Sequence, residues 1–219
     1  MARPVHPRLD DLPRILPIFP LPGLLLLPQG KLPLNIFEPR YLAMIEDALA
    51  WGRLFGIIQP SGPSMAKGEP PLYETGCAGR VSAFGETDDG RLLITVTGVC
   101  RFRVADEVEG TRGYRRVSAD WAPFRDDLDE DPNIAMDRPR LLRVLKPYLR
   151  LRNMDLNWKA LEAADDRSLI VSLCMACPFE PQEKQALLEC ADDTGRAVTL
   201  TTLMEMAVAE RKGTGRLRQ

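Results

Sequence analysis

Histidine is almost absent from this sequence: the only one among 219 residues is His6. It lies in a polar, proline-containing N-terminal segment, residues 1–14, which we expect to be a loosely held arm. Histidine is a common zinc ligand and the usual base of serine and cysteine nucleophiles, so its scarcity argues against both kinds of site. Two catalytic motifs are also missing, the Gly-x-x-x-x-Gly-Lys-Ser/Thr phosphate loop and the Gly-x-Ser-x-Gly serine turn. Residues 62–68 approach the phosphate loop, but their lysine is followed by glycine. The sequence therefore predicts no catalytic site.

Long apolar runs and a strong net charge are missing as well. No apolar stretch approaches the ~20 residues that span a bilayer. The N-terminal apolar stretch follows Asp10 and Asp11 and is broken by prolines, which is unlike a secretory signal. The net charge of −2 gives no sign of a nucleic-acid partner. An odd number of cysteines, five in a long chain, disfavours a disulfide framework and fits a cytoplasmic protein. We also expect no cofactor and no metal.

Cys174 and Cys177 are the clearest candidates for chemistry, because a Cys-x-x-Cys pair can be half a zinc site or a thiol–disulfide motif. No second pair exists, and the motif lies in a segment that reads as an apolar helix. We interpret both residues as core cysteines, with a metal or redox role as the alternative. Residues 126–131 are acidic but lack the glycine and the final glutamate of a calcium loop, so we read them as a solvated linker.

Residues 19–41 combine apolar residues with prolines, which lack an N–H and exclude a helix up to Pro33. We expect short extended pieces there, followed by a helix over about 39–51 with Pro39 in its first turn. Further strands are expected at the ranges 54–58, 73–84, 91–97, 100–105 and 114–121, with a hairpin turn at 87–90. Because no helix separates these strands, the pattern indicates an antiparallel sheet or barrel.

The spacing of apolar residues changes to a helical one in the second half of the chain. We expect helices around 141–149, 168–177, 181–190 and 197–207. The predicted class is α+β. The predicted organisation is a β subdomain (1–122), an acidic linker (123–139), a helical subdomain (140–212) and a basic, solvated tail (213–219).

Several segments, taken in order, are similar to a known family. They are Phe19-Pro-Leu-Pro, Leu32-Pro-Leu-Asn-Ile-Phe-Glu-Pro-Arg-Tyr41, Tyr73-Glu-Thr-Gly-Cys-Ala-Gly-Arg80, Asp89-Gly-Arg-Leu-Leu-Ile-Thr-Val-Thr-Gly-Val-Cys-Arg-Phe-Arg-Val104 and Glu183-Lys-Gln-Ala-Leu-Leu-Glu189. Together they resemble the N-terminal, substrate-binding domain of the ATP-dependent Lon protease, in a stand-alone form. The resemblance implies a PUA-like β-barrel followed by a helical bundle. The family's ATPase and protease modules follow this domain, and Gln219 precedes both, so we expect no enzymatic activity.

The resemblance also implies a module that recognises exposed or unfolded protein segments. Such a segment could pair with a strand edge or enter a groove between barrel and helices. The candidate site residues are Leu24, Phe37, Glu38, Arg40 and Tyr41, and for Glu38 and Arg40 an ion pair that fixes the corner is the alternative. Whether the protein acts beside a full-length protease or forms a homo-oligomer stays open.

Two other functions remain as alternatives. PUA-like folds elsewhere bind RNA, for which the basic candidates are Arg80, Arg91, Arg101 and Arg103. Other relatives hold small ligands in an aromatic cage. Aromatic residues make up only 6% of this chain and its three tryptophans are scattered, so a cage ranks last.

Overall fold

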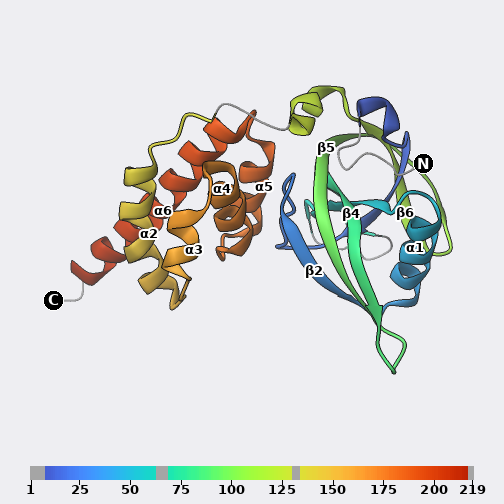
Figure 1. Cartoon of the computed structure of the whole chain (residues 1–219), viewed down its shortest axis with the longest axis horizontal. Coiled ribbons are helices and arrows are strands. Elements are labelled where there is room, and N and C mark those ends of the chain that lie inside the picture. Colours follow the sequence, from blue (N-terminus) through green and yellow to red (C-terminus); the bar gives the residue numbers. More distant parts are fainter. Residues whose placement is uncertain (1–7, 63–68, 130–133, 217–219) are drawn as a thin grey trace. The chain divides into compact units, whose positions relative to one another are not determined.

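A computed structural model describes residues 8–62, 69–129 and 134–216, with side chains up to residue 211 (Figure 1). The chain divides into two compact units, Met1–Glu130 (unit 1) and Asp131–Gln219 (unit 2). Unit 1 holds the strands and one α-helix, and unit 2 is helical, so the predicted mixed α+β class is confirmed. None of the helices in the described part of the chain is both long and apolar enough to cross a membrane.

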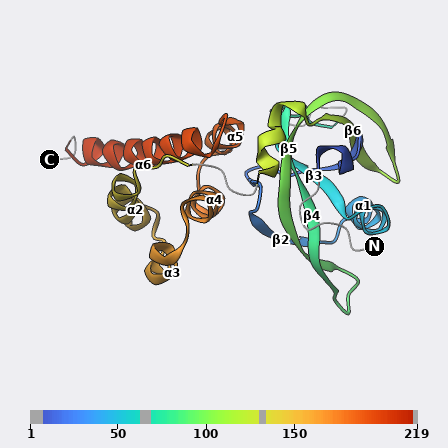
Figure 2. The same cartoon turned by 45° about the horizontal axis from the view of Figure 1, so that its top comes forward.

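Unit 1 is built on one six-stranded sheet in the order β2-β5-β4-β3-β1-β6. An additional pairing between β6 and β5 closes the five strands β5-β4-β3-β1-β6 into a ring, and β2 lies outside it. The long strand β5 pairs with β2 and β4 along its first half and with β6 along its second, and its curvature is visible in Figure 2. The strands are β1 (Ile15–Pro20), β2 (Lys31–Ile36), β3 (Leu54–Ile58), β4 (Thr75–Glu86), β5 (Leu92–Thr111) and β6 (Tyr114–Asp120).

Two strand predictions are wrong. The sheet is not wholly antiparallel, because β1 pairs in parallel with β3. The ranges 91–97 and 100–105 are one strand, since Gly98 does not end β5 but lets another segment cross it. A Cβ atom at Gly98 would lie 2.0 Å from the carbonyl oxygen of Leu27. Gly98 also exchanges hydrogen bonds with Gln29 and Gly30, at 2.8 Å each, which ties the crossing segment to the strand.

The side chain of Phe102 is fully buried and packs against β3 and β4 inside the ring. Two glycines make room for it. A Cβ atom at Gly56 would lie 2.7 Å from the Phe102 ring, and one at Gly76 would lie 2.6 Å from it. Interior packing at this density leaves no space for an added methyl group. The apolar residues of the surrounding core are Leu12, Leu16, Ile18, Leu54, Ile58, Ala78, Cys100, Val117, Ala119 and Trp121.

Helix α1 (Pro39–Ala50) confirms the helix predicted over about 39–51. Glu38 is its N-cap and Pro39 occupies the first turn, where a missing N–H breaks no helical bond. Gly52 follows the helix at φ 104°, a conformation that favours glycine. One face of α1 is buried, and it carries Tyr41, Ala43, Met44, Ile45 and Ala48.

The segment before β1 is held more firmly than we expected. Leu9–Asp11 form a short 3-10 helix, η1, and Leu12 is buried in the core. The indole Nε1 of Trp121 donates to the carbonyl oxygen of Pro13 at 3.1 Å, and Ala119 N donates to Arg14 O at 2.9 Å. The loose N-terminal arm is therefore contradicted for residues 8–14, while His6 lies outside the described residues.

The first part of the region predicted as an acidic linker is helical. Ala122–Leu128 form a 3-10 helix, η2, against β5. Asp127 accepts hydrogen bonds from the backbone N of Arg101 at 2.9 Å and from its guanidinium Nη2 at 2.7 Å. Only 3% of the Arg101 side chain and 9% of the Asp127 side chain are exposed. Asp127 is thus a buried ion-pair partner, which the sequence alone could not reveal because Arg101 lies on a distant strand.

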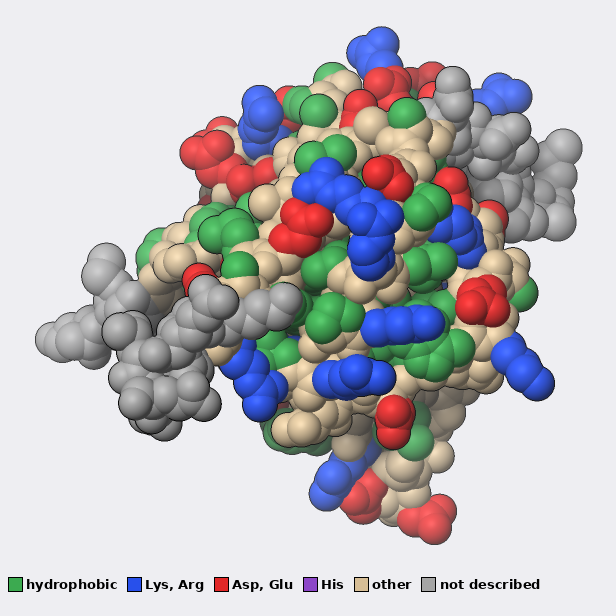
Figure 3. Space-filling view, turned by 90° about the vertical axis from the view of Figure 1, so that its left-hand side faces the viewer, with side chains coloured by type: hydrophobic (Ala, Val, Ile, Leu, Met, Phe, Trp, Pro, Cys, Tyr) green, Lys and Arg blue, Asp and Glu red, His purple; other side chains and the backbone are tan. Residues whose placement is uncertain are grey.

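Unit 2 contains five helices in its described part: α2 (Arg138–Arg152), α3 (Trp158–Ala163), α4 (Asp166–Ala176), α5 (Pro181–Glu189) and α6 (Asp193–Arg216). Four of them were predicted, and the short α3 was not. Helix α6 extends into the predicted tail as far as Arg216. Helix α2 contains no acidic residue, and on it Arg143, Lys146 and Arg150 are exposed. Figure 3 shows Lys and Arg side chains beside hydrophobic ones on a face of unit 2.

Cys174 and Cys177 lie at the C-terminal end of α4 and are fully buried. Burial raises the pKa of both thiols, that of Cys177 to about 12. No group of three His, Cys, Asp or Glu side chains that could hold a metal occurs among the residues the structure describes. Burial and the raised pKa values support the interpretation of these residues as core cysteines.

We predict that Gly76→Ala destabilises unit 1 by about 1–3 kcal/mol, because the new methyl group overlaps Phe102 and the carbonyl oxygen of Ile57. Gly85→Ala, in the same strand, is the matched control: its Cβ would have no heavy atom within 4 Å, so a change within ~0.5 kcal/mol is expected. Urea unfolding of both variants measures the difference. Equal stability of the two would show that Phe102 does not restrict the ring interior.

Asp127→Asn should destabilise the protein by about 3–5 kcal/mol, because it leaves the buried guanidinium of Arg101 without its carboxylate. The neighbouring Asp126 is exposed, so Asp126→Asn is the control and should change stability by less than ~0.5 kcal/mol. The measurement is again the free energy of unfolding in urea. Similar values for the two variants would contradict a structural role for the pair.

Thiol labelling of the native protein should be confined to Cys190, which is the only half-buried cysteine of the described chain, the other four being buried. The Cys190→Ser variant should then show no rapid labelling until it is unfolded. The raised pKa values also predict that stability falls above pH ~9, where the thiols ionise in the unfolded chain but stay protonated in the folded one. Rapid, zinc-sensitive labelling of Cys174 and Cys177 would overturn the structural interpretation.

Candidate functional site

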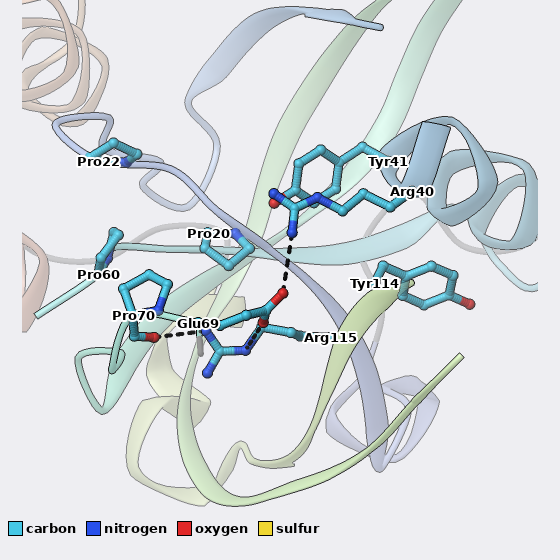
Figure 4. Close-up of a pocket in the computed structure, with 9 residues that line it drawn as sticks. All are labelled: Pro20, Pro22, Arg40, Tyr41, Pro60, Glu69, Pro70, Tyr114 and Arg115. Atoms are coloured by element: carbon cyan, nitrogen blue, oxygen red, sulfur yellow. Dashed lines mark hydrogen bonds and ion pairs between the residues drawn. The ribbon is translucent and has the colours of Figure 1, made fainter. Parts of the chain in front are cut away.

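A pocket of about 300 Å³ opens on unit 1 where β1, α1, β6 and the segment after β3 meet (Figure 4). Its volume lies at the lower end of the ~300–1,000 Å³ range of ligand pockets. Four prolines form much of its wall, and they are joined by two arginines, two tyrosines and one glutamate. The lining residues are Pro20, Pro22, Arg40, Tyr41, Pro60, Glu69, Pro70, Tyr114 and Arg115.

Strand alternation explains why three of these residues meet. Side chains two apart on a strand share a face. Pro20 and Pro60 therefore lie two residues after the buried core residues Ile18 and Ile58. Arg115 lies two residues before the buried core residue Val117. Strand pairing brings these residues close together, because Pro20 is opposite Ile58 and Arg115 is opposite Ile18. The pocket thus lies directly beyond the apolar core of the ring.

Hydrogen bonds between residues 59–61 and residues 71–73 position two more lining residues of the pocket. Ser61 N donates to Pro71 O at 2.8 Å, and Tyr73 N donates to Gln59 O at 3.0 Å. Gln59 also accepts, through its side-chain oxygen, from Gly23 N at 3.1 Å. These bonds bring Pro70 and Glu69 beside the end of β1.

Charge in the pocket is organised around Glu69, whose two carboxylate oxygens bind different arginines. Oε1 accepts from Arg40 Nη1 at 3.2 Å, and Oε2 lies 3.0 Å from Arg115 Nε. Arg115 also binds both oxygens of Glu107, at 2.7 Å each, and donates to Pro70 O at 2.9 Å. Hydrogen bonding to Arg115 lowers the pKa of Glu107, which is therefore ionised at neutral pH.

Tyr41 forms the aromatic part of the wall. Its ring packs against Phe19 with centroids 4.0 Å apart, and the Arg40 guanidinium lies 4.6 Å from the Tyr41 ring centroid. Burial raises the pKa of the Tyr41 hydroxyl, so it stays protonated and can donate a hydrogen bond. Tyr114 also contributes to the wall, but its hydroxyl donates to Asp47 at 2.8 Å and is directed away from the pocket in Figure 4.

The structure brings some of the predicted site residues together and not others. Arg40 and Tyr41 line the pocket, and Glu38 lies behind Arg40, accepting from its Nε at 3.1 Å. Phe37 is 62% exposed but does not line the pocket. Leu24 is half-buried and is also absent from the lining.

Sequence reasoning missed Glu69, Pro70 and Arg115. Pro70 was visible as part of a proline-rich loop, but nothing local showed which strand that loop would meet. Arg115 reaches the pocket only through the pairing of β6 with β1. Side chains alternate along β6, so Arg115 shares a face with buried Val117, two residues away. With the register of β6 against β1 known, this alternation would have predicted Arg115 as a pocket residue.

The residues proposed for the other two functions are dispersed or occupied. Arg101 is buried in its pair with Asp127, and Arg91 pairs with Asp89 at 2.8 Å. The two tryptophans of unit 1 do not form a cage: Trp51 is exposed, and Trp121 belongs to the apolar core.

Comparisons with known proteins identify the family to which the chain is similar. The family model described as the ATP-dependent protease La (LON) substrate-binding domain matches residues 15–206. Lon protease 2 of Myxococcus xanthus is 30% identical over 210 residues, which are 93% of this chain and 25% of that protein. Lon protease of Syntrophus aciditrophicus is 24% identical over 207 residues, or 90% of this chain and 26% of that protein. The chain spans about a quarter of the length of these relatives.

Solved structures agree on the fold. The Lon N-terminal domain protein of Xanthomonas campestris has a TM-score of 0.59 and 24% identity, covering 86% of this chain and 97% of that one. The N-terminal domain of the Mycobacterium avium complex Lon protease has a TM-score of 0.54 and 17% identity, covering 87% and 98%. These matches confirm the resemblance seen in the sequence, and the chain belongs to the family of LON substrate-binding domains.

Proposed function

We propose that this chain is a non-catalytic recognition module that binds exposed, extended segments of other proteins, and that the proline-lined pocket of unit 1 is where they bind. The observation that carries the proposal is the composition of the pocket wall. Prolines have no N–H and present apolar surface, while Arg40, Arg115 and the Tyr41 hydroxyl provide donors for the carbonyl groups of an extended chain. An apolar wall with a few fixed polar groups is typical of specific binding sites.

The pocket is a better candidate than a strand edge. Strand β2 lies outside the ring and pairs with β5 on one side, so its other side is an edge to which a peptide strand could be added. Pro33 lies within β2 and has no N–H to donate, and proline on an edge strand disfavours further pairing. The pocket carries no such obstacle.

Family membership supports a role in substrate recognition. The relatives are named as Lon proteases, and the matched model is of their substrate-binding domain alone, so the proposal includes neither ATPase nor protease activity. We further propose that the closed ring of strands is the PUA-like barrel implied by the resemblance, and that the protein is cytoplasmic. A protease system is the partner we propose to receive the bound segments.

Binding of fluorescent, unstructured peptides, followed by anisotropy, tests the proposal. We expect Arg40→Ala to weaken binding about fivefold, because it removes a donor and the cation over Tyr41, worth ~1 kcal/mol together at this exposure. Arg91→Ala, which removes an equal charge from an exposed ion pair outside the pocket, is the control and should bind like the wild type.

The same assay separates the remaining readings. Phe37→Ala removes an exposed aromatic ring outside the pocket and should leave peptide affinity unchanged. A loss confined to Phe37→Ala would place the site at the end of β2 instead. Salt-sensitive binding of single-stranded RNA without peptide binding would favour the RNA-binding alternative.

A further inference from the structure

Arg40 and Arg115 converge on one carboxylate, that of Glu69, each arginine binding a different oxygen. We propose that the two arginines form a carboxylate subsite within the pocket, that Glu69 fills this subsite when no ligand is bound, and that an acidic group of the bound segment takes its place. The inference rests on the proposed function, because it specifies which segments the pocket prefers.

The arginines keep their positions without Glu69. Arg115 is held by both oxygens of Glu107 and by the carbonyl of Pro70. Arg40 is held by Glu38 and by the face of the Tyr41 ring. Binding groups fixed before the ligand arrives lose less conformational entropy on binding. The subsite is therefore preorganised for a carboxylate that comes from elsewhere.

Glu69 is the member of this group that can leave. In the described part of the chain its carboxylate binds only Arg40 and Arg115, and 43% of its side chain is exposed. Rotation of Glu69 into solvent rehydrates its carboxylate and, among the described residues, breaks only its ion pairs with Arg40 and Arg115. By comparison, Arg115 is only 12% exposed, so losing its partners without replacement would leave a largely desolvated cation.

The charges of the pocket favour exchange over simple addition. Among the described residues, Arg40 and Arg115 carry two positive charges, while Glu38, Glu69 and Glu107 carry three negative ones. An acidic ligand added beside Glu69 would enter a site with an excess of negative charge. If the ligand's carboxylate replaces that of Glu69, the local charge is unchanged and both arginines stay paired. The preferred ligand is thus an extended segment with a carboxylate next to apolar residues.

Three matched peptides test this inference and identify the source of the carboxylate. One has an internal glutamate and an amidated C-terminus, the second has glutamine there and a free C-terminus, and the third has glutamine and an amidated C-terminus. We expect one of the first two to bind roughly fivefold more tightly than the third, in keeping with a pair of partly exposed ion pairs, and the preference to shrink in high salt.

Variants locate the effect. Glu69→Gln should raise the affinity of the preferred acidic peptide about fivefold and leave the neutral peptide unchanged, because it empties the subsite of its charge. Glu46→Gln removes a carboxylate that pairs with Arg112, outside the pocket lining, and should change neither affinity. Arg40→Gln should abolish the preference for acid, while Arg91→Gln should retain it. Thermal melting checks that each variant is folded.

The outcomes separate the two proposals. Binding of all three peptides with equal affinity to both the wild type and Glu69→Gln overturns the carboxylate subsite and leaves the recognition module intact. Failure of every peptide to bind overturns the module and the subsite with it. Tighter binding of the acidic peptide that Glu69→Gln does not alter overturns the role of Glu69 as the internal occupant.

Discussion

The packing of Phe102 inside the ring of strands is the constraint on which the rest of unit 1 depends. The ring can close around this side chain because Gly56 and Gly76 carry no Cβ atom, and Phe102 in turn fills the space that the closed sheet would leave empty. Closure requires β5 to pair with β4 and then with β6. The same ring contains the pairing of β6 with β1, which places Arg115 beyond the core and opposite Ile18. The pocket is therefore a consequence of how the interior is packed.

Much of the fold could be predicted because its signals are local. Prolines and glycines in the range 19–41 predict short extended pieces, and short apolar patterns predict the buried strand β3 and helix α1. The errors come from pairings between distant segments. Gly98 reads as a strand end, yet it is required where the chain at Leu27 crosses β5. Asp127 reads as a linker residue, and only the approach of η2 to β5 turns it into the partner of Arg101.

The same division between local and distant signals explains which parts of the site could be predicted. Glu38, Arg40 and Tyr41 are neighbours at the start of one helix, so their common location follows from the sequence. Glu69 and Arg115 join them through a returning segment and a strand pairing that no local pattern encodes. Exposed Phe37 shows the opposite case, since an aromatic residue in the right segment need not face the pocket.

An internal carboxylate at the proposed recognition site has a physical reason in this protein. Arg115 lies at the end of an apolar interior and is mostly shielded from water, so the free protein is more stable when the cation is fully paired. Exchange of one carboxylate for another hardly changes the number of ion pairs or the local charge. The contribution of the subsite to the binding free energy is therefore only the difference between the ion pairs of the ligand and those of Glu69. Such a site discriminates acid from amide weakly and releases its ligand readily. Both properties suit the proposed function, a module that examines many protein segments and passes each one on.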